Sequence, residues 1–585
     1  MEFLSKVIRG IRNGKMQEFI GEILWIFRFS VRYRWQILWY IVVGILSTGM
    51  GLGSSVVSKY MIDTVTGYHS SQLALAASLY IGMRVAQILA NMLTDYISAG
   101  ISIHVEQEIR ANVFARIMQA DWQALAEYHS GDILNRVNSD VSTVSSSVLS
   151  LVPDAITRSV QFLGALCIIL YYDPPLAVLS LLSAPVTILV SKTLMRNMRR
   201  FNKKLRESSS RMMSFHEESF QNIQFIKSFG LTRQYGERLD EVQKEYRDCT
   251  MEYKRFSIKT AAMMSFTGMA VSSLCFGWGI YRLWTGRITY GTMTLFLQMS
   301  STLASAFSLL INLVPGAISA ATSAGRIMEL TELPKENAAE EQRAAQLAAV
   351  AQTDGIELDV DHIDFSYDNS RLILHQACLR VQSGEVIALV GPSGEGKTTM
   401  LRILLGLVNV QAGALRARAG AEDMSLSAST RCLFSYVPQG NTMFSGTVAD
   451  NLRMVKPDAT DEQLIAVLRD ACAYEFIEKL PDGIYSKVKE RGGGFSEGQA
   501  QRLAIARALL SPAPVMLLDE ATSALDVATE RRVLRNIMHS EQNKACVVTT
   551  HRPSVLGICT RIYRISDRQV TLANQQEVDA WIQDF

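Results

Sequence analysis

The sequence predicts a multidomain fold: an all-α membrane domain of six transmembrane helices with long cytoplasmic helical extensions, followed by an α/β domain built around a phosphate-binding loop. The first observation is a set of six mostly apolar stretches before about residue 320, each near the roughly 20 residues that cross a bilayer. The second is GPSGEGKT at residues 391–398, which fits the pattern G-x-x-x-x-G-K-[ST] without a mismatch. With 585 residues, 48% of them hydrophobic, the chain is too long for one ordinary core.

The six apolar stretches define the membrane domain, which we place at residues 35–331. Their approximate limits are 36–58, 72–94, 148–171, 175–195, 261–284 and 291–314. The second and third stretches, and again the fourth and fifth, are separated by long polar segments with helical patterning. We expect helices that project into the cytoplasm, because structureless connections of that length are uncommon. Each projection must turn back, and the predicted turns lie near Trp122–His129 and Gln221–Phe229.

Two charged residues fall within or beside the second predicted span. Arg84 and Asp95 are eleven residues apart, which is about 20° around a helix, so they share one face. Charge inside a membrane indicates a functional role, here lining a substrate cavity or pairing across the bundle. Packing or snorkelling at the interface explains the same pattern equally well, so both interpretations stay open.

The basic residues orient the chain in the membrane. They concentrate before the first span and between the fourth and fifth, from Lys192 to Lys259, whereas the loops on the other side nearly lack lysine. Positive residues stay inside, which predicts a multi-pass protein of the cell (inner or plasma) membrane with both termini cytoplasmic. Residues 1–34 read as an amphipathic helical segment at the cytoplasmic interface, without a cleavable signal peptide.

Charge and cysteine content exclude other classes. The formal net charge of +2 gives no case for nucleic acid. The eight cysteines form no C-x-x-C pair, which predicts free thiols and neither a zinc site nor disulfides. Residues 332–356, rich in Ala, Glu and Gln, are predicted to be a partly helical linker to a nucleotide-binding domain at 357–585.

The phosphate-binding loop lies between an apolar strand, Glu385–Val390, and a helical pattern at Thr398–Val408. Its glycines let backbone N–H groups point at a phosphate beside a helix N-terminus. Lys397 can reach the terminal phosphates, and the Thr398 hydroxyl can help to hold Mg²⁺. The nucleotide contacts predicted for this loop are Gly391, Ser393, Gly394, Gly396, Lys397, Thr398 and Thr399.

A second apolar strand, Val515–Glu520, ends in two carboxylates. Downstream of a phosphate-binding loop, this arrangement predicts that Asp519 holds Mg²⁺ and that Glu520 polarises the attacking water. A nucleoside triphosphate and Mg²⁺ are therefore expected at this site, and the family resemblance that follows implies that the nucleotide is ATP.

Three further motifs carry a resemblance to a known family. GGGFSEGQAQRLAIARALL (492–510), SALD (523–526) and TTHR (549–552) resemble the ATPase domain of an ATP-binding-cassette (ABC) transporter. Behind a six-span membrane domain, this is the arrangement of bacterial-type ABC exporter half-transporters. YHSGDILNRVNSDV (128–141) and SAGRIMEL (323–330) are similar to stretches in the membrane domains of such exporters, so the resemblance covers essentially the whole chain.

The resemblance implies roles for individual residues. Tyr367 would stack on adenine, and Gln439 would touch both Mg²⁺ and the attacking water. His551 would be the switch histidine that contacts the γ-phosphate, and Asp526 would communicate across a dimer. The signature residues that would contact a γ-phosphate held by another subunit are Ser496, Gly498 and Gln499.

The signature motif departs from the family pattern. The usual L-S-G-G-Q reads FSEGQ here, with Phe495 for Leu and Glu497 for the first Gly. A carboxylate near a triphosphate would repel it unless the side chain points outward, which the retained Ser496, Gly498 and Gln499 suggest. A homodimer is expected, and this departure makes a heterodimer with one weakened site the alternative.

The expected function is ATP-driven export of an amphipathic or hydrophobic small molecule, drug or peptide across the cytoplasmic membrane by an alternating-access dimer. The expected partners are a second copy of the chain, membrane lipid and the exported cargo. Two other readings remain open: a lipid flippase, and an ATP-gated channel or regulator without net transport. The intact Glu520 favours a cycling pump, since a gate can dispense with hydrolysis.

Overall fold

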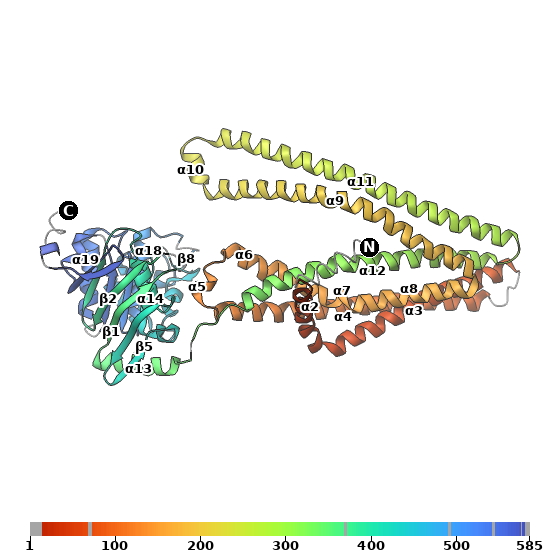
Figure 1. Ribbon diagram of the computed structural model, residues 1–585. Coiled ribbons are helices and arrows are strands. Elements are labelled where there is room, and N and C mark those ends of the chain that lie inside the picture. Colours follow the sequence, from red (N-terminus) through yellow and green to blue (C-terminus); the bar gives the residue numbers. More distant parts are fainter. Residues whose placement is uncertain are drawn as a thin grey trace. The chain divides into compact units, whose positions relative to one another are not determined.

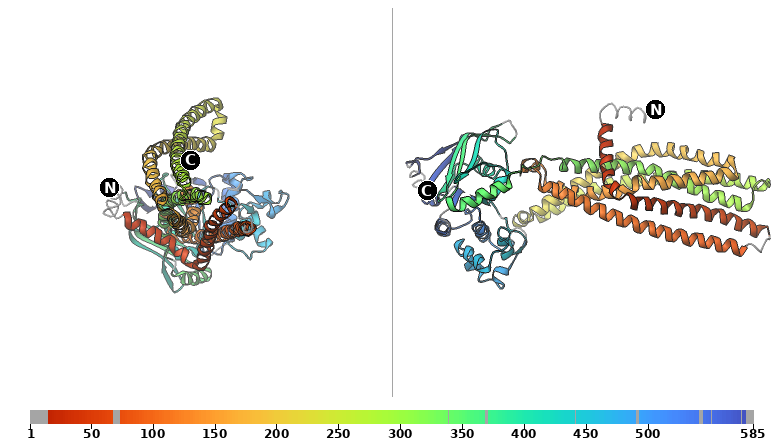
Figure 2. Two further views of the ribbon diagram at one scale, coloured as in Figure 1. Left: turned by 90° about the vertical axis from the view of Figure 1, so that its right-hand side faces the viewer. Right: turned by 90° about the horizontal axis from the view of Figure 1, so that it is seen from below.

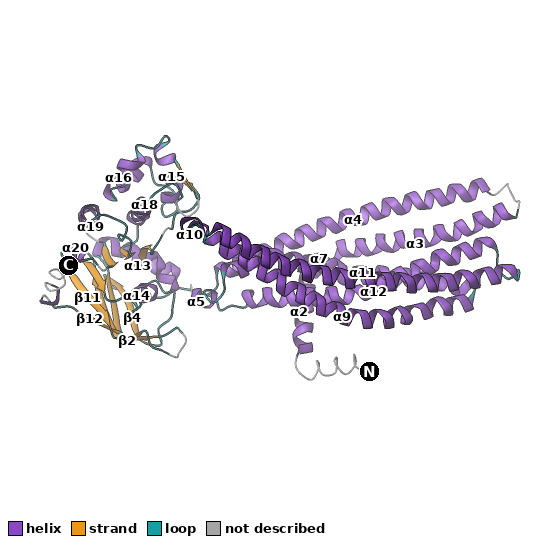
Figure 3. Cartoon of the chain, turned by 90° about the horizontal axis from the view of Figure 1, so that it is seen from above, coloured by secondary structure: helices purple, strands orange, loops and turns teal. Residues whose placement is uncertain are grey.

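The computed structural model describes residues 15–67, 73–337, 339–367, 371–440, 442–489, 493–540, 544–550, 552–574 and 576–578. The chain divides into two compact units (Figure 1). Unit 1 comprises Met1–Arg116 and Ser130–Glu332, and unit 2 comprises Ile117–His129 and Leu333–Phe585. Among the described residues, unit 1 is helical and the named β-strands all belong to unit 2 (Figure 3). An α-helical membrane-type domain followed by an α/β domain confirms the predicted fold class.

Unit 1 is built from long helices connected by short ones. In chain order they are α2 (Lys15–Arg32), α3 (Arg34–Thr66), α4 (Leu73–Met118), α6 (Ser130–Asn135), the π-helix η2 (Arg136–Asp140), α7 (Val141–Leu151), α8 (Pro153–Tyr172), α9 (Pro174–Gln221), α10 (Ile223–Ser228), α11 (Thr232–Trp284) and α12 (Tyr290–Thr331). Helix α12 packs against α3, α7 and α8, and α9 packs along α11 with α10 at their connection (Figure 1). Helix α2 turns away from α3 and packs against α12 and α7 (Figure 2).

Five helices among the described residues are long and apolar enough to cross a membrane: α3, α4, α8, α11 and α12. The predicted span at 175–195 lies in α9, where the side chains of residues 179–197 fall outside the described set. The long predicted extensions are present as uninterrupted helices, since α4, α9 and α11 have 46, 48 and 53 residues. The third predicted span starts too early, because Pro153 opens a new helix at its first turn and residues 148–151 belong to α7.

Two segments that carry the family resemblance in unit 1 contact each other. The buried Asp140 accepts hydrogen bonds from Ser323 (2.9 Å) and from the guanidinium of Arg326. Arg136 donates to the Arg326 carbonyl and to the Glu329 carboxylate, each at 2.7 Å. This charged network joins η2 to the end of α12 through two ion pairs, each with one buried partner, Arg136 or Asp140. Removing the exposed partner of either pair would leave a buried charge uncompensated.

Unit 2 contains two main sheets. An antiparallel sheet has the order β2 (Leu374–Gln382), β1 (Glu357–Phe365), β4 (Ala412–Ala419), β5 (Glu422–Ser425). A six-stranded sheet has the order β12 (Gln569–Leu572), β11 (Arg561–Ser566), β3 (Val386–Val390), β10 (Ala545–Thr549), β9 (Val515–Asp519), β6 (Phe434–Val437), and only its β12 edge is antiparallel. A short ribbon pairs β7 (Gly446–Thr447) with β8 (Lys487–Val488).

The helices of unit 2 surround these sheets. They are α5 (Trp122–Leu125), α13 (Glu341–Asp354), α14 (Lys397–Leu404), η3 (Ala428–Leu433), α15 (Val448–Arg453), α16 (Asp461–Asp470), α17 (Tyr474–Ile477), η4 (Gly483–Tyr485), α18 (Glu497–Leu510), α19 (Val527–Ser540) and α20 (Pro553–Leu556). Strands β3, β9 and β10 are buried along their whole length, as expected for parallel strands covered on both faces.

Two apolar cores flank the six-stranded sheet. Alternate residues of β3 enter different cores: Val386 and Ala388 pack on one side, and Ile387 and Leu389 on the other. Helix α13, inside the segment predicted to be a linker, buries Ala344, Leu347 and Ala351 in the second core. The sheet is therefore held rigidly from both faces, which fixes the carboxyl ends of β3, β9 and β10 where the candidate site lies.

Candidate nucleotide-binding site

The phosphate-binding loop connects the end of β3 to the start of α14, as its sequence context predicts. Gly391, Gly394 and Gly396 have φ angles of +152°, +87° and +110°, which favour glycine over residues with a Cβ. A Cβ atom on Gly391 would lie only 2.1 Å from the carbonyl oxygen of Ile565. Ser393 is exposed in the turn between these glycines. The loop therefore approaches β11 so closely that its first glycine has no substitute.

Lys397 is almost completely buried at the first position of α14. Its ammonium Nζ donates hydrogen bonds to the carbonyl oxygens of Gly391 (2.7 Å) and Pro392 (3.0 Å). Burial lowers the pKa of this group, against the opposing field of Glu520, Asp519 and Glu395. The lysine is thus hydrogen-bonded to its own loop, and the two acids at the carboxyl end of β9 oppose its charge.

Asp519 lies at the end of β9 with three hydroxyl groups around it. Its Oδ1 accepts from Thr398 Oγ1 (3.2 Å) and Thr549 Oγ1 (2.8 Å), and its Oδ2 accepts from the Tyr436 hydroxyl (3.4 Å). Asp519 as a whole is only 2% exposed. The structure therefore brings together Thr398 and Asp519, two of the three predicted Mg²⁺ ligands, as a hydroxyl and a carboxylate that suit a hard cation. The third, Gln439, contacts Glu520.

Glu520 follows directly and adopts a φ of +48°, which a residue with a side chain rarely adopts. Its backbone N–H donates to Thr549 Oγ1 (2.9 Å), and its Oε2 accepts from Gln439 Nε2 (2.8 Å). Backbone strain of this kind clusters at functional sites. Two of the three predicted catalytic residues, Glu520 and Gln439, are thus in contact. The third, His551, lies outside the described residues.

Tyr367, the predicted adenine-stacking residue, is 38% exposed beside the start of α14. Its hydroxyl lies 3.4 Å from Thr399 Oγ1 and accepts from Arg402 Nη1 at 3.0 Å. Its ring contacts Phe365 edge-on, with centroids 4.9 Å apart. Tyr367 is therefore a partly exposed aromatic ring whose hydroxyl is anchored beside α14, as a residue that stacks on a base would be.

The first predicted docking turn belongs to unit 2 and contacts this tyrosine. Asp121 caps α5 by accepting from the N–H of Gln123 (2.9 Å). Gln123 Nε2 donates to the carbonyl of Tyr367 (3.3 Å), and the Arg402 guanidinium lies 5.0 Å from the centre of the Trp122 ring. A movement of α5 would therefore change the contacts of Tyr367 and Arg402.

The signature residues form the N-terminus of α18. Ser496 Oγ accepts from the N–H of Gln499 (3.3 Å), and Gln499 Oε1 accepts from the N–H of Ser496 (2.8 Å), which makes a capping box. A Cβ atom on Gly498 would lie 2.8 Å from the carbonyl oxygen of Ala524, so this glycine lets α18 approach the loop before α19.

Asp526 ends that loop and caps α19. Its Oδ1 accepts from the N–H of Thr529 (2.9 Å), and hydrogen bonds from Thr529 hold the pKa of its carboxyl below the usual value. Within the described part of the chain, no hydrogen bond or ion pair joins Asp526 or the signature residues to the phosphate-binding loop. The structure therefore brings the predicted site residues together in two separate groups.

The departure from the family signature, Glu497, is exposed in the first turn of α18. We expect Glu497→Gln to lower the ATP concentration for half-maximal hydrolysis about two- to fivefold at low salt, because a carboxylate there opposes a phosphate at the helix N-terminus. The difference should shrink at high ionic strength, where exposed charges are screened. Steady-state ATPase assays at two salt concentrations measure both effects. An unchanged value at low salt would show that the carboxylate points away from the phosphate.

Four residues of these networks were not among the predicted site residues: Thr549, Tyr436, Gln501 and Arg402. Thr549 could have been predicted from the sequence, because it ends an apolar strand, β10, and the carboxyl ends of parallel strands meet at one edge of a sheet. Gln501 had no such signal. Its side chain is buried in α18 and bonds Ser523 Oγ (3.2 Å) and the N–H of Ala524 (3.0 Å), which links the signature helix to the Asp526 loop.

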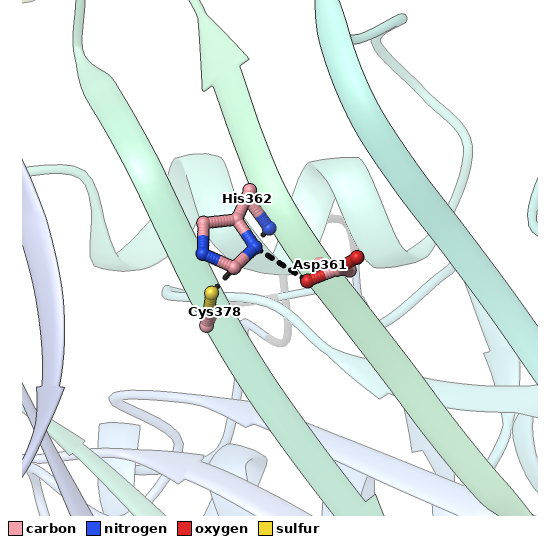
Figure 4. Close-up of side chains that lie close together, drawn as sticks. All are labelled: Asp361, His362 and Cys378. Carbon is pink, nitrogen blue, oxygen red and sulfur yellow. Dashed lines mark hydrogen bonds and ion pairs between the residues drawn. The ribbon is translucent and has the colours of Figure 1, made fainter.

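A second cluster of potential ligand atoms lies on the antiparallel sheet, away from this site. A bulge between Val360 and Ile363 brings Asp361 and His362 of β1 beside Cys378 of β2 (Figure 4). His362 Nδ1 lies 2.5 Å from Asp361 Oδ1, and the His362 N–H donates to Cys378 Sγ at 3.4 Å. These bonds and the bulge account for the arrangement without a ligand.

Comparison with known proteins identifies both units. A family model described as the ABC transporter transmembrane region matches residues 37–307, and one described as ABC transporter matches residues 374–523. A multidrug resistance ABC transporter ATP-binding and permease protein of Lactococcus lactis subsp. lactis (strain IL1403) is 26% identical over 539 residues, which cover 91% of this chain and 89% of the relative. A protein of Staphylococcus aureus (strain NCTC 8325 / PS 47), named for multidrug export, is 26% identical over 553 residues, or 93% and 95% of the two chains.

The fold is also that of a solved transporter. A bacterial Atm1-family ABC exporter with ATP bound superposes with a TM-score of 0.77 and 20% sequence identity, over 94% of this chain and 97% of the other. The two family models together match well over half of the chain, in the order of membrane domain and ATPase domain. This chain therefore belongs to the ABC transporters, as a half-transporter with its membrane and ATPase domains fused.

Proposed function

We propose that two copies of this chain export an amphipathic or hydrophobic small molecule, drug or peptide across the cell membrane, driven by hydrolysis of Mg²⁺-bound ATP. One observation carries the proposal: the Thr398–Asp519–Thr549 network and the Gln439–Glu520 pair meet at one edge of the sheet, in a chain whose other unit is a bundle of membrane helices. The names of the two relatives, both of which refer to multidrug transport, support the same direction.

The residues divide the work of hydrolysis. The phosphate-binding loop and Lys397 hold the triphosphate, and Thr398 with Asp519 would hold Mg²⁺, which neutralises phosphate charge when bound. Glu520 accepts the proton of the attacking water, and Gln439 fixes the orientation of the Glu520 carboxylate through its 2.8 Å hydrogen bond. Tyr367 offers its ring to the base.

A second copy of the chain completes the site. Ser496, Gly498 and Gln499 form a helix N-terminus that suits a phosphate, yet in the described part of the chain they make no polar contact with their own loop. The signature of each copy would close over ATP held by the other copy. Closure and reopening then alternate the access of the membrane helices. The distribution of basic residues supports cytoplasmic termini.

The function is tested with the full chain in inside-out vesicles. We expect ATP-dependent accumulation of a fluorescent amphipathic drug or peptide against its gradient, with ATPase activity stimulated by the same compound. Glu520→Gln vesicles serve as the matched control. Accumulation that stops at equal concentrations would indicate a channel, and movement of labelled lipid between leaflets with no cargo uptake would indicate a flippase. Either result would contradict the proposal.

A further inference from the structure

A polar cavity of about 880 Å³ lies in unit 1 between α3, α4, α8 and α12, each of which is a candidate membrane span. Its walls are rich in serine, threonine, asparagine and glutamine. Four charged side chains also line it: Arg84, Asp95, Asp154 and Arg158. Such a cavity is unusual at membrane depth, because polar groups there are expensive and mark a ligand pathway.

The contacts along α3 show how the cavity is arranged. Ser47 Oγ bonds Asn91 Oδ1 (2.5 Å), and a Cβ on Gly51 would lie 2.7 Å from Gln87 Nε2, so α3 and α4 run antiparallel. Tyr40 donates to Asp154 Oδ1 at 2.7 Å, which places the start of α8 beside the start of α3. Asp95 therefore lies toward the same end as Asp154, and Arg84 toward the opposite end.

The charges form an uneven pattern along the cavity. One end holds Asp95, Asp154 and Arg158, with a formal charge of −1, and the other holds Arg84, with a formal charge of +1. At 1.5 Å per helical residue, the eleven residues between Arg84 and Asp95 correspond to about 16 Å along α4. This is the separation of the two backbone positions, so a ligand that contacts both side chains must carry an anion and a cation a comparable or somewhat shorter distance apart.

The arginines have not been neutralised by pairing within the bundle. Arg84 Nη1 donates to Gln87 (3.2 Å) and Arg158 Nη1 to Gln161 (3.1 Å). Among the described residues, none of the four charged side chains forms an ion pair. Arg84 and Asp95 are exposed at the cavity. The sequence left two interpretations of Arg84 and Asp95 open, a role at a substrate cavity and packing or snorkelling at the interface. The structure favours the cavity.

We propose that this cavity binds a short extended peptide with free termini, with its ammonium group at Asp95 and Asp154 and its carboxylate at Arg84. An extended chain spans about 3.3–3.6 Å per residue, so about 16 Å corresponds to roughly five residues. A zwitterionic lipid headgroup fits less well, because its ammonium and phosphate are neighbours and reach only one end. The inference rests on the proposed export function and names its class of cargo.

Calorimetric titration of the detergent-solubilised full chain tests the assignment. The probes are a pentapeptide of leucine, alanine and phenylalanine with free termini, its C-terminal amide and its N-acetyl form. We expect each capped form to bind at least tenfold more weakly to the parent. Amidation of the peptide should not weaken its binding to Arg84→Gln, and acetylation should weaken its binding to Asp95→Asn much less than to the parent. Each variant has already lost the partner of the capped group. Arg287→Gln, an exposed arginine outside the cavity, should behave as the parent does.

The outcomes separate this inference from the proposed function. Equal binding of free and capped peptides, no peptide binding, or displacement of the peptide by a zwitterionic lipid would each overturn the assignment of the cavity. Peptide binding with the expected pattern but without ATP-dependent uptake in vesicles would support the cavity and contradict export. ATP-dependent uptake of the free pentapeptide that is equal in the parent, Arg84→Gln and Asp95→Asn would support export and overturn the assignment of the cavity.

Discussion

Replacing Glu520 by glutamine is expected to lower the rate of ATP hydrolysis about 10²- to 10⁴-fold, the usual contribution of a general base. The amide keeps the shape of the side chain and can keep a hydrogen bond with Gln439, which now holds the carboxylate at 2.8 Å. What it loses is the ability to accept a proton from water. The strained φ of +48° at this position aims the side chain regardless of its charge, so the fold should tolerate the change.

Two measurements distinguish the loss of the catalytic base from a general loss of folding or of ATP binding. Phosphate release reports the rate, and the fluorescence of a nucleotide analogue reports ATP affinity, which should stay at the value of the parent or improve. Glu422→Gln is the matched control, because Glu422 lies on the edge strand β5 away from the site and contacts only Arg343 at 3.9 Å among ion pairs of the described residues. If Glu520→Gln hydrolysed ATP as fast as the parent, another group would have to be the base.

The membrane fold was predictable because its signal is strong and local. A helix in a bilayer must satisfy its own backbone, so about 20 apolar residues suffice to mark it. Each predicted span falls in a long helix, except that the third begins across the break at Pro153. What the sequence could not provide is the direction that each side chain faces. Arg84 and Asp95 needed α3 and α8 around them before cavity and packing could be distinguished.

The nucleotide site also contains features that the sequence predicts and features that it does not. The phosphate-binding loop and the two acids are readable because a triphosphate fixes the residue types and their order. The position of Thr549 at the end of a strand could be predicted, but the hydrogen bonds that support the two acids could not, because they join strands far apart in the chain. Thr549 reaches Asp519 and Glu520 only because β10 lies beside β9 in register, and the Tyr436 hydroxyl approaches Asp519 from β6. Spacing in the sequence carries no trace of that register.

Replacing Lys397 by methionine is expected to weaken ATP binding about 10- to 100-fold, since a hydrogen bond to a charged group contributes roughly 1.5–3 kcal/mol. Methionine has a similar length and suits the buried position, where Lys397 is only 6% exposed. The loss has two sources. The phosphates lose a cation, and Asp519 and Glu520 keep their negative charge beside the nucleotide without the ammonium that opposes it.

Nucleotide titration of the purified full chain measures this affinity, with Glu520→Gln as its counterpart. The two variants should lose different properties of the parent. Lys397→Met loses ATP affinity, whereas Glu520→Gln loses turnover and binds ATP at least as tightly as the parent, because one repelling carboxylate is gone. The double variant should bind more tightly than Lys397→Met, since removing Glu520 relieves part of the uncompensated charge. If it bound more weakly than either single variant, the lysine and the acid would not act on the same phosphates, and the site built from β3 and β9 would be wrong.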